Sequence, residues 1–229
     1  MNKLEDILAR AAGSAKNGAR TERRGKDRAS GSGATGIFTR LGRLYAKMET
    51  AYKECAETAG LRCEGCENNC CASFFQHHTH IEWAYLWRGL QELPAERRKE
   101  FVQRAHEYVE KARRNIASGR LPDAMCPLNE QGLCALYSHR LMICRLHGTR
   151  NLFRLPNGGE QVFPGCFRFT ALPCAAEGNE SGCPTLDRTP LYGELASLEM
   201  EYLRRASRRM SRVDMTLAEM LVLGPPQLR

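Results

Sequence analysis

The sequence lacks the motifs of several large enzyme classes. It has no G-x-S-x-G motif for a serine nucleophile, no phosphate-binding P-loop and no H-E-x-x-H zinc-protease motif. No methyltransferase strand–loop motif and no internal repeat are evident either. These absences exclude no single reaction, so whether the chain is an enzyme stays open at this stage.

Long apolar segments are also missing. The first 18 residues contain no continuous apolar core of a signal peptide, and no run is long enough to span a bilayer. We therefore expect a cytoplasmic protein that does not use a membrane. In a reducing cytosol, many cysteines indicate metal binding more often than disulfides. Export by an unrecognised route would favour disulfides again.

Cysteine is what the sequence has in excess. The chain has 229 residues and 11 cysteines, and a chain of this length can bury a core without disulfide staples. Four of the cysteines, Cys63, Cys66, Cys70 and Cys71, form the pattern C-x2-C-x3-C-C. Thiolates at such short spacing suit a metal ion that prefers soft ligands. The neighbours Cys70 and Cys71 fit a disulfide poorly, because a bond between adjacent residues is strained.

The periodicity of apolar residues predicts a mainly α fold with a small irregular cysteine-rich metal module and one β-hairpin. Capping boxes are expected at Thr79–Glu82 and Thr216–Glu219. Helices are expected at 4–12, 37–58, 79–93, 94–118 and 189–210, with a short one after residue 216. A strand is expected within 73–78, and the hairpin strands at 151–155 and 160–163.

Three parts are expected along the chain. Residues 1–36 would form a short helix and a flexible basic linker, 37–188 a helical cysteine-cluster metal-binding domain, and 189–229 C-terminal helices packing on it. The linker contains a G-x-G-x-x-G pattern at Gly31, Gly33 and Gly36. That pattern binds dinucleotides only after a buried strand, and the residues before it cannot form one, so we interpret it as linker.

A second group of cysteines follows on turn-rich segments, where the backbone bends around a metal more easily than in a helix. The predicted metal ligands are therefore Cys63, Cys66, Cys70, Cys71, Cys126, Cys134, Cys144 and Cys166. Cys55 lies on the apolar stripe of the 37–58 helix and is interpreted as a small core residue. Cys174 and Cys183 fall in a loop predicted at 171–188.

These motifs resemble the YkgJ-type cysteine-cluster family over about residues 60–170. The resemblance rests on the first cluster, then on C-P-L-x5-C-A-L-Y-x2-R-x3-C-R from Cys126 to Arg145, and on Cys166. It implies a zinc- or iron-chelating domain with eight cysteines. Members of that family usually carry Arg-Pro where this chain has Arg140-Leu141, which removes no ligand. The family also resembles flagellin lysine N-methylases in its cysteine region, which implies a metal- or cluster-dependent enzyme as an alternative.

The identity of the metal stays open. All-sulfur ligation suits zinc and iron–sulfur clusters alike. Eight thiolates could form two zinc sites, or one four-cysteine cluster beside four structural thiols. The spacing matches neither the ferredoxin pattern nor the radical-SAM pattern, whose third cysteine would fall at Ser73. Reduced cysteines without a metal are the remaining alternative.

Other residues have a functional and an ordinary interpretation. The histidines His77, His78, His80, His139 and His147 are candidate ligands or plain surface residues. Arg140 and Arg145, beside cysteines, would offset thiolate charge or simply lie exposed. The formal net charge is +8, with basic runs at 16–28 and 204–212. A nucleic-acid-binding module is therefore a further alternative, although interleaved acidic residues and few aromatics favour solvated helix faces.

Overall fold

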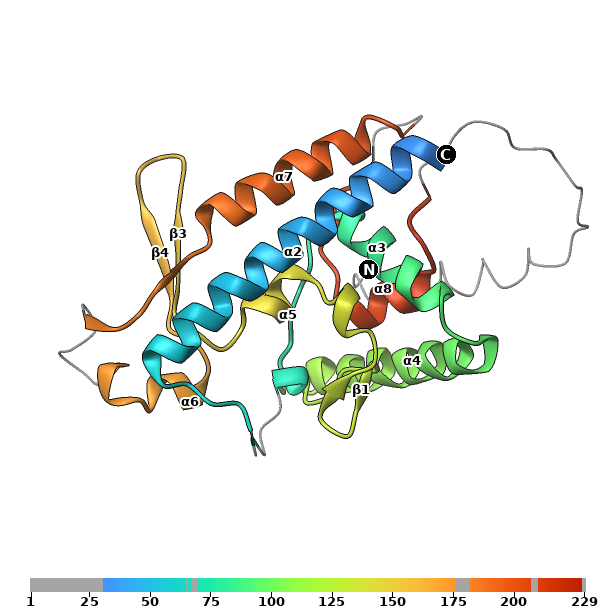
Figure 1. Cartoon of the computed structure of the whole chain (residues 1–229). Coiled ribbons are helices and arrows are strands. Elements are labelled where there is room, and N and C mark those ends of the chain that lie inside the picture. Colours follow the sequence, from blue (N-terminus) through green and yellow to red (C-terminus); the bar gives the residue numbers. More distant parts are fainter. Residues whose placement is uncertain (1–30, 65, 67–69, 176–181, 207–209, 228–229) are drawn as a thin grey trace, which may run out of the picture. The chain divides into compact units, whose positions relative to one another are not determined.

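The computed structural model describes residues 31–64, 66, 70–175, 182–206 and 210–227 (Figure 1). Within these ranges the chain is mainly helical, with five short strands in two small sheets. The predicted mainly α fold with few strands is confirmed. The helix predicted at 4–12 and the linker up to residue 30 lie outside the described residues. In the described part of the chain, no helix has both the length and the apolar character needed to cross a membrane.

The residues fall into two compact units, each built from separate stretches of chain. Unit 1 takes the described residues within Cys71–Arg140 and Arg205–Arg229, together with 31–36. Unit 2 takes those within Ile37–Cys70 and Leu141–Arg204. The three parts predicted from the sequence, with boundaries at residues 36 and 188, stay a prediction. The two units are defined by contacts between residues, and such contacts do not show which segments fold independently.

Unit 2 is organised along the long helix α2, Gly31–Ala59, which runs beside α7, Thr189–Leu203 (Figure 1). Arg40 pairs with Glu201 at 2.6 Å, and Lys47 pairs with Glu194 at 2.7 Å. The predicted apolar stripe of α2 is buried at Ile37, Leu41, Leu44, Tyr45 and Met48. Burial of that stripe stabilises the helix more than its propensity does.

Both of these helices differ from their predicted bounds. α2 begins at Gly31 and not at residue 37, so the last part of the predicted linker, with its G-x-G-x-x-G pattern, is helical. Glycine lowers helix propensity but does not forbid the conformation when a long helix follows. α7 ends at Leu203, short of the predicted residue 210, because the buried positions of α7 stop at Tyr202.

A three-stranded sheet and short helices complete unit 2. β3, Asn151–Arg154, pairs antiparallel with β4, Glu160–Phe163, which confirms the predicted hairpin. β5, Leu186–Asp187, adds a parallel edge to β3 and was missed because two residues give no alternation to detect. The remaining elements are α5 at Met142–Leu146, α6 at Phe167–Thr170 and a 3-10 turn, η3, at Pro173–Ala175.

Unit 1 consists mainly of three helices. They are α3 at His80–Gln91, α4 at Ala95–Ala117 and α8 at Leu217–Leu223. α8 packs against α4. The indole N–H groups of Trp83 and Trp87 both donate to the carbonyl oxygen of Met220, at 3.0 and 2.9 Å. The predicted helices at 79–93 and 94–118, and the short one after residue 216, are confirmed.

The two predicted capping boxes form differently. At α8 the box is complete: the Thr216 hydroxyl accepts from the backbone N–H of Glu219, and the Glu219 carboxylate accepts from the backbone N–H of Thr216. At α3 the Thr79 hydroxyl instead donates to the Glu82 carboxylate at 2.8 Å. The Thr79 side chain makes no capping hydrogen bond to a backbone N–H at the start of this helix. The pattern therefore located both helix starts correctly, but only one full box is present.

Short elements link the helices of unit 1. The strand predicted within 73–78 is wrong, because His77 makes only an isolated bridge to Met215 and no neighbour extends the ladder. A 3-10 turn, η1, covers Cys70–Ala72. The Cys126–Cys134 loop contains a minimal hairpin of β1, Asn129–Glu130, and β2, Leu133–Cys134. A second 3-10 turn, η2, follows at Tyr137–His139.

Candidate metal centre

The C-x2-C knuckle begins directly after the C-terminus of α2. Gly60, with φ of 77°, ends the helix, and the N–H of Leu61 reaches back to the carbonyl oxygen of Ala56 at 2.8 Å. This pattern of bonds satisfies helix-end carbonyls and redirects the chain. The N–H of Cys66 then donates to the carbonyl oxygen of Cys63 at 3.3 Å, which closes the knuckle as a tight turn.

Arg168 holds the knuckle from a distant part of the sequence. Its Nη1 atom donates to the carbonyl oxygens of Arg62 at 2.8 Å and Glu64 at 2.9 Å. The guanidinium thus fixes the backbone on both sides of Cys63 and brings a positive charge close to it. Sequence reasoning missed Arg168, although its position two residues after Cys166 was an available signal.

The hydroxyl group of Tyr52 contacts one predicted ligand, and the charges of two others raise its pKa. It lies 3.7 Å from the Sγ atom of Cys63. The pKa of Tyr52 is raised, first by burial, then by the hydrogen bond to Cys63, and also by the charges of the Cys166 and Cys70 thiolates. Within unit 2, Cys63 therefore contacts this hydroxyl, and Cys166 and Cys70 act on it electrostatically. The sequence indicated Tyr52 only as part of an apolar stripe.

Two glycines make room for this arrangement. Gly148 has φ of 126°, and a Cβ atom there would lie 2.5 Å from the Tyr52 hydroxyl oxygen. Gly165 has φ of 93°, and a Cβ atom there would lie 2.7 Å from the carbonyl oxygen of Gly148. The N–H of Cys166 donates to that same carbonyl at 3.0 Å. The close contact of these two loops is what brings Cys166 toward Tyr52.

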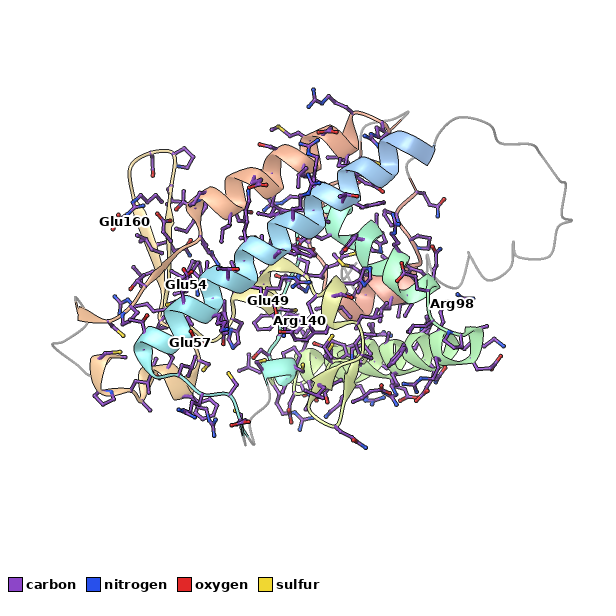
Figure 2. The ribbon with its side chains drawn as sticks, viewed as in Figure 1. Glu49, Glu54, Glu57, Arg98, Arg140 and Glu160 are labelled. Atoms are coloured by element: carbon purple, nitrogen blue, oxygen red, sulfur yellow. The ribbon has the colours of Figure 1, made fainter. Side chains whose placement is uncertain are left out.

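Cys144 lies half-buried on α5, beside the fully buried Arg145. The Arg145 guanidinium stacks 4.1 Å from the centre of the Tyr45 ring and lies 3.9 Å from the Glu49 carboxylate. Figure 2 shows Glu49 on α2, together with Glu54 and Glu57. Arg145 is therefore engaged in packing α5 against α2, an arrangement that its position beside a cysteine did not indicate.

The remaining predicted ligands belong to unit 1. The N–H of Cys126 donates to the carbonyl oxygen of Cys71 at 2.9 Å, so the two cysteines lie on adjacent backbone segments. Cys134 pairs with Asn129 in the minimal hairpin. Burial, with further effects of Cys126 and Glu219, raises the pKa of Tyr108 to about 12. Tyr108 and Cys126 also line an open cavity of about 730 Å³.

The eight predicted ligands are thus divided between the units. Unit 2 holds Cys63, Cys66, Cys70, Cys144 and Cys166, and unit 1 holds Cys71, Cys126 and Cys134. Within the described ranges, no three or more His, Cys, Asp or Glu side chains already have the arrangement of a metal site. The donor atoms fit zinc or iron in type, because both metals accept thiolate ligands.

The candidate histidines lie mostly inside the protein. Exposure on the surface was the favoured interpretation of the three histidines after the first cluster. Of these, only His78 is exposed. Its Nδ1 atom lies 3.6 Å from the Asp214 carboxylate. His77 is 2% exposed, and burial, with a smaller effect of His78, lowers its pKa to about 3. His80 is also buried. The apolar surroundings of this segment, unseen in the sequence, account for the difference.

The other two histidines also have packing roles. His139 stacks on Tyr85, with ring centres 4.5 Å apart, and a Cβ atom at Gly89 would lie 2.4 Å from its ring. Gly89 is thus required for α3 to approach η2. Burial lowers the pKa of His147.

The guanidinium of Arg140 stacks 4.1 Å from the Tyr137 ring.

Two further sequence predictions concern residues away from the ligands. Cys55 is 9% exposed on α2, which confirms its interpretation as a core residue. The basic run at 16–28 lies outside the described residues, and so does the centre of the run at 204–212. The nucleic-acid alternative therefore stays a prediction from charge alone.

Comparison of the chain with protein-family models found no matching family. Comparisons with curated proteins and with solved structures found no match either. The resemblance to the YkgJ-type family accordingly stays a prediction that rests on the cysteine motifs from Cys63 to Cys166.

Proposed function

We propose that this chain is a metal-binding protein that chelates zinc or iron through its cysteine thiolates, with an iron–sulfur cluster as one form of the bound iron. The observation that carries the proposal is the contact of Cys63 with the Tyr52 hydroxyl at 3.7 Å, a hydroxyl whose pKa the charges of Cys166 and Cys70 also raise. Cys63 and Cys166 are about a hundred positions apart in the sequence. An apolar core alone would not require a thiol in a tight C-x2-C turn in contact with a tyrosine hydroxyl.

The surroundings of these thiols suit a bound cation. The raised pKa of Tyr52 keeps its hydroxyl protonated, so the group can donate a hydrogen bond to a thiolate. Arg168 offsets part of the negative charge that several thiolates carry, and it orders the knuckle that presents Cys63 and Cys66. Zinc bound in this way would stabilise the fold, whereas an iron–sulfur cluster would also supply electron transfer.

Unit 2 holds five predicted ligands, Cys63, Cys66, Cys70, Cys144 and Cys166, one more than the four thiols that a tetrahedral zinc site or a four-cysteine cluster requires. In unit 1, Cys71, Cys126 and Cys134 provide a further set of three. This assignment follows the division of the chain into units, and it predicts that ligand substitutions in one unit leave metal bound by the other.

The test is elemental analysis with an absorption spectrum of full-length protein purified without oxygen. We expect bound zinc without colour, or iron with the brown absorption of a cluster. Cys63→Ser and Cys166→Ser should each lower the metal content, while the control Cys55→Ala should not. Protein that is folded by circular dichroism but carries no zinc or iron would overturn the proposal, as would full metal content in both serine variants.

One observation favours the enzyme alternative. The cavity of about 730 Å³ in unit 1 has the predicted ligand Cys126 in its wall, together with Arg104, Glu107 and Lys111. A cavity with charged walls beside a metal ligand is where a small substrate would bind. The resemblance implies redox chemistry or methyl transfer, and calorimetry with S-adenosylmethionine tests the second. Saturable binding supports methyl transfer, and the absence of heat for the metal-loaded protein counts against it.

A further inference from the structure

The three-stranded sheet of unit 2 has two different faces, because successive residues of a strand point to opposite sides. On one face, Arg154 of β3 forms ion pairs with Glu160 of β4 and Asp187 of β5. Arg188 follows β5 directly, and the alternation turns its side chain to the other face. The acidic residue next to Arg188 in the sequence is therefore engaged with a different arginine.

Arg188 lies on aromatic rings instead. Its guanidinium carbon is 3.7 Å from the centre of the Phe163 ring on β4 and 5.5 Å from the centre of the Phe153 ring on β3. Tyr192, near the start of α7, stacks on Phe153 with ring centres 5.0 Å apart. The guanidinium thus reaches from the end of β5 across the sheet to β4.

This arginine is half-buried and has no acidic partner. In the part of the chain that the structure describes, Arg188 forms no ion pair, and its buried Nε atom has no hydrogen-bond partner. Burial, opposed by a smaller effect of Tyr192, lowers the pKa of Arg188. A cation that loses water without gaining a carboxylate costs free energy, and a bound anion would recover part of that cost.

β4 is the edge strand of this sheet, whose order is β4-β3-β5 (Figure 1). The N–H of Leu155 donates to the carbonyl oxygen of Gly159 at 2.8 Å at the end of the hairpin. Because bonded pairs alternate along an antiparallel ladder, the backbone groups of Glu160 and Val162 point outward. Among the described residues, no other segment bonds to these groups. An edge of this kind can accept a further strand.

We propose that β4 binds an extended peptide as an added strand, and that an acidic side chain of this peptide pairs with Arg188. The backbone of the peptide bonds to the outward groups of Glu160 and Val162. Neighbouring strands lie about 4.8 Å apart, and side chains at adjacent positions touch. A carboxylate beside Phe163 therefore reaches the guanidinium that lies over the Phe163 ring.

Charge defines the partner. A peptide in which acidic and apolar residues alternate offers carboxylates to Arg188 and apolar side chains to the opposite face, where Val162 is 45% exposed. A single unpaired arginine suits one carboxylate better than the repeated phosphates of a nucleic acid, which require a row of cations. The proposal does not depend on metal binding by the cysteines.

Fluorescence anisotropy with the full-length protein tests the ion pair. The probe is a labelled octapeptide of alternating valine and glutamate, which offers a glutamate to Arg188 in every register shifted by two residues. We expect saturable binding that weakens with salt. Arg188→Gln should weaken binding by about tenfold, because a charge-assisted contact is lost. Arg43→Gln on α2, an exposed position in the same unit with the same loss of charge, is the control and should bind nearly as the wild type does.

N-methylated peptides test the added strand on the wild-type protein. One peptide carries the methyl groups on its valine amides and the other on its glutamate amides. One of the two should keep binding and the other should lose it, because alternate amides of a strand face the same edge.

Four results would overturn the proposal. They are binding of both methylated peptides, binding of neither, equal affinities of Arg188→Gln and Arg43→Gln, and no binding of the unmethylated peptide at millimolar concentration. Tighter binding of a labelled oligothymidylate, lost in Arg188→Gln, would also overturn it and assign this face to nucleic acid.

Discussion

The hydroxyl oxygen of Tyr52 and the Sγ atom of Cys63 lie 3.7 Å apart, at the junction of the central helix of unit 2 and the first cysteine motif. The tyrosine comes from the helix and the cysteine from the turn after it, eleven positions later. Their contact orients the knuckle relative to α2. It also gives the candidate metal centre a neutral hydrogen-bond donor that no cysteine motif indicates.

Tyr52→Phe removes this donor and keeps the ring. Groups that hydrogen-bond to metal ligands typically contribute at least about tenfold to metal affinity, so we expect zinc affinity to fall by about tenfold. Competition with a chromophoric chelator measures that affinity. Tyr192→Phe is a suitable control, because Tyr192 is an exposed tyrosine of α7 in the same unit. Unchanged affinity in Tyr52→Phe would show that the contact does not act on a ligand.

Arg168→Gln should loosen the knuckle without unfolding unit 2. The variant loses two hydrogen bonds to the carbonyls of Arg62 and Glu64, which are typically worth about 1 kcal/mol each or less at a partly exposed site. We expect lower metal affinity and only a small change in melting temperature. Arg154→Gln on β3 is the control, since it removes an exposed arginine that pairs with Glu160 and Asp187. An equal loss of metal in both variants would contradict the role of Arg168.

Gly148→Ala should destabilise the protein by about 1–3 kcal/mol, because the position combines a positive φ with a close contact. The added methyl carbon would lie 2.5 Å from the Tyr52 hydroxyl. Denaturant unfolding measures the loss. Gly158 has φ of 83°, and a Cβ atom there would meet no neighbour within 4 Å. Gly158→Ala is therefore a control that measures the cost of the positive φ alone.

The same contact predicts coupling between the two residues. In a Tyr52→Phe background the hydroxyl is gone, so Gly148→Ala should cost less free energy of unfolding than it does in the wild type. Equal costs in the two backgrounds would mean that the strain at Gly148 does not come from this contact.

The two capping boxes should differ in energy. Thr216→Ala removes a complete box from a buried helix start and should cost about 1–2 kcal/mol. Thr79→Ala removes a hydroxyl that bonds only the Glu82 side chain, and should cost clearly less. Both are measured by urea unfolding. A larger effect at Thr79 would show that helix initiation depends on something other than the backbone bonds.

Acid should weaken the fold through His77. Its pKa is about 3 in the folded chain, below the value near 6.5 expected when unfolded. Between these values the unfolded chain binds a proton that the folded chain does not, so the free energy of unfolding falls as pH falls, by up to about 1.4 kcal/mol per pH unit. His77→Phe should flatten this dependence between pH 6 and 4. An unchanged slope in His77→Phe would exclude His77 as its source.

The helices were largely predictable because their apolar residues recur at helical spacing. Leu41, Leu44 and Met48 define the buried stripe of α2 on sequence grounds alone, and Thr216 with Glu219 located α8. The apolar pattern could not predict that α2 starts at Gly31, because glycine residues do not contribute to an apolar periodicity. The two-residue strand β5 is set by its parallel pairing with β3, which is a tertiary contact.

The eight cysteine ligands stay a prediction from sequence, and the surroundings of these cysteines could not be predicted. Cysteine spacing indicated the thiols, but Tyr52, Arg168 and Gly148 act through contacts between segments distant in sequence. The burial of His77 likewise depends on the segment around Met215, more than a hundred positions later.

The packing of α8 against α4 has a consequence for synthesis of the chain. α4 ends at Ala117, whereas α8 begins only at Leu217, so a ribosome completes the first helix long before its partner exists. Until residue 223 has left the exit tunnel, the apolar side of α4 that contacts α8 stays uncovered. The nascent protein therefore passes through a period in which chaperones can reach this half before it closes.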